Sequence, residues 1–190
     1  DPEIVAALEL YLFEARPDLV VISGDFTQRA RVAQYREACA FVDRLERGGL
    51  ALLAVPGNHD VPLYDVVRRF VRPLHRYRRF IDDDLCPWFE SDDLAVLGIN
   101  TARSLTIKDG SISLEQMATI RQCFREVAPE KTRILVTHHP LFAMPIGDEG
   151  ELTKVVKRHS DALTAVAEAG VHLLLAGHFH RTYARSAREM

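Results

Sequence analysis

The chain has 190 residues, 47% hydrophobic and 27% charged, which suits a single globular domain over residues 1–190 with a sizeable core. A formal net charge of −3 argues against a nucleic-acid partner and against a membrane-surface protein, because both classes are usually basic. No run approaches the roughly 18 to 20 apolar residues of a membrane span. Three widely spaced cysteines, Cys39, Cys86 and Cys123, favour reduced thiols and a cytoplasmic location over a disulfide framework.

Amphipathic stretches alternate with short apolar runs along the chain. The apolar spacing predicts four helices, over Ile4–Ala15, Arg31–Arg47, Leu114–Val127 and Leu152–Ala169. The apolar runs predict five strands, over Leu19–Ser23, Leu50–Val55, Leu94–Ile99, Arg133–Thr137 and Val171–Ala176. This alternation predicts a layered α/β domain with mainly parallel strands, in which ligands bind beyond the carboxyl ends of the strands.

Two stretches break the alternation. Residues 61–93 carry an arginine-rich, helix-like run followed by Asp82-Asp83-Asp84. We consider two interpretations: a surface insertion whose opposite charges offset each other, or a lid whose arginines attract an anionic substrate. Residues 143–151 are the second such stretch, and we expect them to form a flexible loop over the functional site.

Polar strings stand directly after four of the predicted strands. They are Gly24-Asp25, Pro56-Gly57-Asn58-His59-Asp60, His138-His139-Pro140 and Gly177-His178-Phe179-His180. A carboxylate can bridge two cations, an asparagine offers a neutral oxygen, and imidazole nitrogens bind transition metals. In an extended segment the rings of His178 and His180 project to one side, as a paired ligand set requires. The strings therefore predict a metal centre at one edge of the sheet.

Each string also has a plain structural interpretation. Gly24-Asp25 alone is typical of a turn, and a histidine pair separated by one residue arises often by chance. We assign no functional role to His75, His159 and His172. His75 and His159 fall in predicted helices, and His172 opens a predicted strand. The prediction of a metal centre rests on the four strings occurring together and in this order.

Together these strings resemble the signature of the calcineurin-like metallophosphoesterases, over about Leu19 to Tyr183. Within that superfamily the strings, with Asn100-Thr101, are most similar to the bacterial class III cyclic-nucleotide phosphodiesterases. The resemblance implies a layered α-β-β-α sandwich. It also implies two divalent metal ions, manganese, iron or zinc, in the intact protein.

When the ligand pattern of the family is assigned residue by residue to this sequence, the resemblance implies two metal sites that are not equally complete. One ion would be held by Asp25, Asn58, His138 and His178. The other would share Asp25 and use His180, together with an Asp-x-His motif that the family carries upstream of Gly24-Asp25. We therefore expect a fragment incomplete at the N-terminus and at the C-terminus, with one well-formed site and a second that is weak or absent.

The resemblance also assigns roles to neighbouring residues. His59 would contact the phosphate and act as a general acid, with Asp60 orienting it. The substrate-binding residues would be Asn58, His59 and His139.

The implied function is metal-dependent hydrolysis of a small phosphate ester. We expect a phosphodiesterase of cyclic nucleotides or similar diesters that uses a metal-bridging hydroxide, in a protein that could pair as a homodimer. The alternatives are a phosphomonoesterase or nucleotide pyrophosphatase of the same superfamily, and a catalytically dead scaffold with this fold. The presence of His59 argues against the scaffold.

Overall fold

The computed structural model describes residues 2–104, 109–146, 151–180, 182–184 and 186. The helices are α1 (Pro2–Ala15), α2 (Val32–Arg47), α3 (Val66–Val71), α4 (His75–Phe80), α5 (Leu114–Arg125) and α6 (His159–Glu168), with a 3₁₀ turn η1 (Asn58–Asp60). The strands are β1 (Val20–Ile22), β2 (Leu52–Ala54), β3 (Trp88–Glu90), β4 (Leu94–Ile99), β5 (Thr132–Thr137), β6 (Pro145–Ile146), β7 (Glu151–Leu152) and β8 (Leu173–Ala176).

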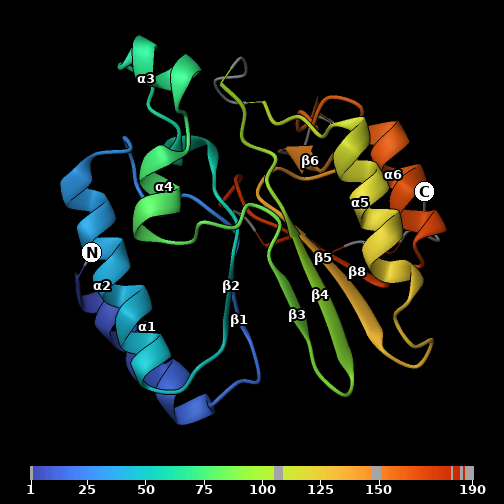
Figure 1. Ribbon diagram of the computed structural model, residues 1–190, viewed down its shortest axis with the longest axis horizontal. Coiled ribbons are helices and arrows are strands. Elements are labelled where there is room, and N and C mark those ends of the chain that lie inside the picture. The colour runs from blue at the N-terminus through green and yellow to red at the C-terminus, as the bar shows by residue number, and fades with distance from the viewer. Residues whose placement is uncertain (1, 105–108, 147–150, 181, 185, 187–190) are drawn as a thin grey trace.

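The strands form two facing sheets and a short hairpin. β1 and β2 pair in parallel, and a second sheet has the order β3-β4-β5-β8, in which β4, β5 and β8 are parallel and β3 is antiparallel to β4. Helices α1 and α2 lie outside β1 and β2, and helices α5 and α6 lie outside the four-stranded sheet (Figure 1). This is the expected α-β-β-α sandwich.

Alternating side chains of the central strands build the two layers of the core. Val96 and Val136 point between the sheets, where they pack with Leu53. Their neighbours Leu97 and Leu135 point to the opposite face and pack against α5 and α6. Successive side chains of a strand face opposite sides of the sheet, so a continuous apolar run is what a strand covered on both faces requires.

The prediction of one long helix over Leu152–Ala169 was wrong for the first half of that range. Leu152 belongs to β7, and α6 begins only at His159. Lys157 donates its backbone N–H to the carbonyl of Gly110, and Arg158 adopts a left-handed conformation with φ of 64°. The non-local backbone bond and the positive φ prevent a helix from continuing through this segment.

The arginine-rich run described as helix-like forms the short helices α3 and α4, whereas the strand β3 and the β6–β7 hairpin were not predicted. Within residues 61–93 lie α3, α4 and β3, and Tyr77 of α4 is fully buried beside Tyr35 of α2. Part of this stretch is therefore packed against the domain. Of the loop expected over 143–151, residues 145–146 and 151–152 form the β6–β7 hairpin, and residues 147–150 lie outside the described residues.

Two helices present apolar side chains to the exterior. None of the residues of α1 is buried, and Ile4 and Tyr11 are 67% and 65% exposed. On α3, Val67 is 74% exposed. Within the described ranges, none of the helices has the length and apolar character that crossing a membrane requires.

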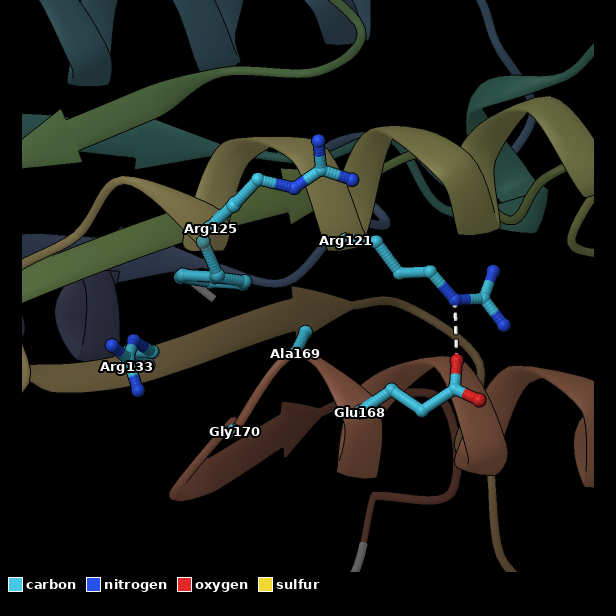
Figure 2. Close-up of a pocket in the computed structure, with 7 residues that line it drawn as sticks. Arg121, Arg125, Arg133, Glu168, Ala169 and Gly170 are labelled. Carbon is cyan, nitrogen blue, oxygen red and sulfur yellow. Dashed lines mark hydrogen bonds and ion pairs between the residues drawn. The ribbon is translucent and has the colours of Figure 1, made fainter.

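A cavity lies at the amino-terminal edge of the four-stranded sheet. Arginines in its lining contact residues at the C-terminal ends of α5 and α6. Figure 2 shows Arg121 of α5 paired with Glu168 of α6, at 2.5 Å. Arg133 of β5 donates to the carbonyl of Val127 just after α5, at 2.9 Å. Basic side chains at helix C-termini satisfy the last carbonyls. These contacts hold α5 and α6 against the sheet, at the end opposite the polar strings.

Candidate metal centre

Four of the predicted ligands converge at the carboxyl edge of the sheets. Asp25, Asn58, His138 and His178 follow β1, β2, β5 and β8 respectively. The Asn58 amide oxygen lies 3.0 Å from His138 Nε2 and 3.0 Å from His178 Nδ1. The two histidine nitrogens are 3.2 Å apart, and Asp25 Oδ2 lies 3.4 Å from His138 Nε2. Residues up to 153 positions apart in the sequence thus bring four potential donor atoms together at this edge.

The orientation of His138 is fixed from behind by the backbone. Its Nδ1 lies 2.7 Å from the carbonyl oxygen of Ser23, which can only accept, so the proton of the neutral ring resides on Nδ1. Nε2 then turns its lone pair toward Asn58, Asp25 and His178. A metal-ligating histidine has this arrangement, with one nitrogen held by a carbonyl and the other free to coordinate.

Both histidines of the centre favour the neutral form. Burial, together with the neighbouring His138, lowers the pKa of His178 to about 4. Burial also lowers the pKa of His138, against the opposing effect of the Asp25 carboxylate. Neutral imidazole is the form that binds metals, so neither ring must first lose a proton at neutral pH.

Glycines allow the loops of the centre to approach one another. A Cβ on Gly57 would lie 2.1 Å from Asp25 Oδ1, and a Cβ on Gly24 would lie 2.6 Å from His138 Nδ1. Gly24 also has a φ of 92°, which L-residues with side chains rarely adopt. Larger residues at either position would displace a candidate ligand.

Three candidate ligands occupy left-handed backbone conformations. Asp25, His178 and His180 have φ values of 58°, 77° and 52°. Such conformations are uncommon for residues other than glycine, and they persist where the surroundings over-determine them. Their concentration at one edge of the sheet is typical of a functional site.

The donor set fits a divalent transition metal. Around a tetrahedral zinc ion with ligands at about 2.0–2.1 Å, ligand atoms lie roughly 3.3–3.4 Å from one another. Four of the six separations among these atoms, 3.0, 3.0, 3.2 and 3.4 Å, are close to that spacing. Several of these atoms carry lone pairs and face one another, an arrangement that a cation between them would stabilise.

One protein family matches nearly the whole chain. The family model of the calcineurin-like phosphoesterases matches residues 1–182. The chain belongs to this family. Its sequence is 24% identical to a probable cyclic nucleotide phosphodiesterase of Synechococcus sp., over 90% of this chain and 61% of the relative. The chain thus spans about three fifths of the length of that relative.

A solved structure shows the same fold in a distant protein. The purple acid phosphatase PPD1 from yellow lupin (Lupinus luteus) seeds superposes with a TM-score of 0.70 over 90% of this chain and 32% of that one. The sequences are 15% identical, so this likeness concerns the fold alone.

In this calcineurin-like phosphoesterase, His59 stands at the rim of the centre. Its backbone N–H donates to Asp25 Oδ1 at 3.0 Å, which leaves Oδ2 directed toward His138. Its ring Nδ1 lies 3.0 Å from the carbonyl oxygen of Gln28, and the residue is exposed. The backbone of His59 therefore orients the Asp25 carboxylate, while its ring remains accessible.

Asp60 holds the loop that carries His59 and does not contact the His59 ring. Its carboxylate is fully buried and accepts the backbone N–H groups of Gly57, Phe26 and Thr27, at 2.9, 3.3 and 3.0 Å. Burial raises the pKa of Asp60 to about 7, although these three donors favour the charged form. The expected contact between Asp60 and the His59 ring is replaced by a clamp between the β1 and β2 loops.

His180 and His139 lie beside the four converging residues. His180 lines the same cleft of about 210 Å³ as Asp25, His138 and His178, and it is exposed. His139 is buried, with Nδ1 2.9 Å from Thr101 Oγ1, yet one of its nitrogens lies within 4.8 Å of ligand atoms of His138 and His178. The family resemblance assigned His139 to substrate binding, and the structure places it, buried, in the histidine cluster.

The residues that sequence reasoning missed act mainly through backbone atoms. Ser23 and Gln28 offer carbonyl oxygens to His138 and His59. Every residue has a carbonyl oxygen, so no residue type signals this role. The two residues could have been suspected only from their positions beside the Gly24-Asp25 string.

Proposed function

We propose that this chain forms the metal-binding domain of a phosphodiesterase, with Asp25, Asn58, His138 and His178 holding one divalent ion. The convergence of these four donor atoms, with the His138 ring held by Ser23, carries the proposal. Mixed nitrogen and oxygen donors without thiolate suit manganese, iron or zinc. When bound, the metal would polarise the phosphoryl oxygens and lower the pKa of a coordinated water. A second ion would take Asp25 and His180.

His59 is the proposed general acid of this reaction. The Gln28 carbonyl holds the Nδ1 proton, so the proton given to the departing alkoxide would come from Nε2 of the imidazolium form. The ring is exposed and its backbone is fixed to Asp25, so the acid stands at the rim where a leaving group would exit. Asp60 supports this position through the loop.

A diester is the proposed substrate, because the Synechococcus relative is described as a probable cyclic nucleotide phosphodiesterase. The test is manganese-dependent hydrolysis of bis(p-nitrophenyl) phosphate, compared with p-nitrophenyl phosphate, by the wild type and His59→Ala. The proposal predicts faster turnover of the diester and a loss of about 10²–10⁴-fold in His59→Ala at equal metal content. Preferential hydrolysis of the monoester would replace the diesterase by a phosphomonoesterase, and equal rates for the variant would remove His59 from the chemistry.

A further inference from the structure

A second cavity, of about 480 Å³, is lined by residues that follow β4 and by the segment from the end of α3 into α4. Its charged and titratable lining consists of Arg72, His75, Arg78 and Arg103, and none of its described lining residues is acidic. By contrast, the arginine-lined cavity of Figure 2 includes Glu168, which pairs with Arg121. The lining of the cavity beyond β4, unlike that of the Figure 2 cavity, therefore contains no carboxylate among the described residues.

Arg103 is fixed in place by a neutral partner. Its Nη2 donates to Oε1 of Gln116, the residue that also accepts from the backbone N–H of Ser113, at 3.0 Å. The Gln116 amide nitrogen in turn donates to the carbonyl of Asn100, at 2.7 Å. Burial lowers the pKa of Arg103, and no carboxylate of the described chain forms an ion pair with it. A half-buried guanidinium without a counter-charge favours an anion beside it.

The other two arginines come from a different part of the chain, the α3–α4 segment. Arg72 follows α3 and is exposed, and within the described residues no carboxylate pairs with it. Arg78 of α4 pairs with Asp83 at 2.8 Å, which offsets part of its charge. The net charge of the cavity therefore depends chiefly on Arg72 and Arg103.

The cavity adjoins the metal centre through one residue. Asn100 and Ala102 line the cavity, and between them Thr101 bonds to His139 Nδ1 at 2.9 Å. The His139 ring centroid lies 4.6 Å from that of His178, a proposed ligand. The segment 100–102 is thus a wall shared by the cationic cavity and the histidine cluster.

We propose that this cavity binds an oxyanion such as a phosphate, sulfate or carboxylate group through Arg103 and Arg72. A guanidinium presents its N–H groups in a planar fork that matches the oxygens of such anions. The anion could be a second charged group of the substrate, an assignment that rests on the proposed function, or a free anion that binds beside the metal centre. The chemistry of recognition is the same for both sources.

The first test needs no catalytic activity. The metal-free chain is titrated with sulfate at pH 8 by isothermal calorimetry, for the wild type, Arg72→Gln and Arg103→Gln. The control is Arg79→Gln, which removes the same charge from α4 but lies outside the cavity lining. The proposal predicts one saturable site, weakened about 10-fold or more in both lining variants and by less than about 2-fold in the control. Absence of saturable binding, or equal weakening by Arg79→Gln, would overturn it; Arg72→Gln decides the matter should Arg103→Gln fail to fold.

The second test separates the two sources in the manganese-loaded protein. If the anion belongs to the substrate, Arg72→Gln raises KM for a dinucleotide bearing a terminal phosphate and leaves KM for bis(p-nitrophenyl) phosphate unchanged. If the anion is free, added sulfate changes the rate on bis(p-nitrophenyl) phosphate in the wild type and not in Arg72→Gln. Identical behaviour of wild type and Arg72→Gln in both assays would overturn the link to the metal centre. An inactive protein would contradict the proposed function while leaving the sulfate titration fully interpretable.

Discussion

The His138 ring donates from Nδ1 to the backbone carbonyl of Ser23, at 2.7 Å and across 115 positions of sequence. This bond joins the end of β5 to the end of β1 and sets which nitrogen of His138 faces Asn58 and His178. Secondary structure alone brings the four strand ends to one edge of the fold. The backbone bond turns that proximity into a defined set of donor atoms.

Asp60 should be required for the stability of the two loops that carry Asp25 and His59. We expect Asp60→Asn to lower the free energy of unfolding by about 2–3 kcal/mol, because the new amide group would face a backbone N–H that the carboxylate now accepts. Urea unfolding of the metal-free chain measures this change. Asp43→Asn is the control, because Asp43 lies on α2 and its contact with Arg47 is exposed and 3.9 Å long. Equal effects of the two substitutions would refute the clamp.

Gly57 should be required for the position of the Asp25 carboxylate. A Cβ at this position would lie 2.1 Å from Asp25 Oδ1 and 2.4 Å from its backbone nitrogen, so Gly57→Ala must push the β1 loop away. We expect a destabilisation of about 1–3 kcal/mol and a weaker metal affinity. Gly49→Ala separates the two effects, because a Cβ there meets nothing within 4 Å although its φ is 84°. Its stability should fall through backbone strain while its metal affinity stays unchanged; unchanged metal affinity in Gly57→Ala would contradict the prediction.

The neutral state of His178 should make the metal-free fold sensitive to acid. The folded pKa is about 4 and the ordinary value is 6.5, so between these values the unfolded chain binds the proton more readily. The stability contributed by the neutral ring is therefore present above pH 6.5 and is lost as the pH falls toward 4. The measurement is urea unfolding from pH 7.5 to 4.5 with chelator present. The wild type should lose stability relative to His178→Asn over this window, and a constant difference between them would count against a buried neutral ring.

The sequence predicted those parts of the molecule that depend on local pattern. Continuous apolar runs located β4 and β5 correctly because both faces of these strands are covered, by the first sheet and by α5 and α6. The candidate ligands were predictable because each one directly follows such a run. The role of Asp60 was not, since its partners Phe26 and Thr27 lie 34 and 33 positions away and bind through their backbone N–H groups.

Other features depended on contacts that no local pattern encodes. The start of α6 is set by a left-handed Arg158 and a backbone bond from Lys157 to Gly110. The strand β3 has only three residues and forms by pairing with β4. A segment of three residues is too short to show an alternation of apolar and polar residues. Arg72 and Arg103 line one cavity, and the sequence alone could not predict that these two arginines lie beside the same cavity.

Metal binding by the chain tests the central claim most directly. The metal-free protein is titrated with Zn²⁺ in competition with a chelating indicator, for the wild type, His138→Ala, His178→Ala and the control His159→Ala, which removes an exposed histidine of α6. We predict one tight equivalent for the wild type and for His159→Ala, and a loss exceeding about 10–100-fold in affinity for each of the other two variants. A wild type that binds no better than His138→Ala, or a control that loses as much affinity as the ligand variants, would contradict a metal centre built from these residues.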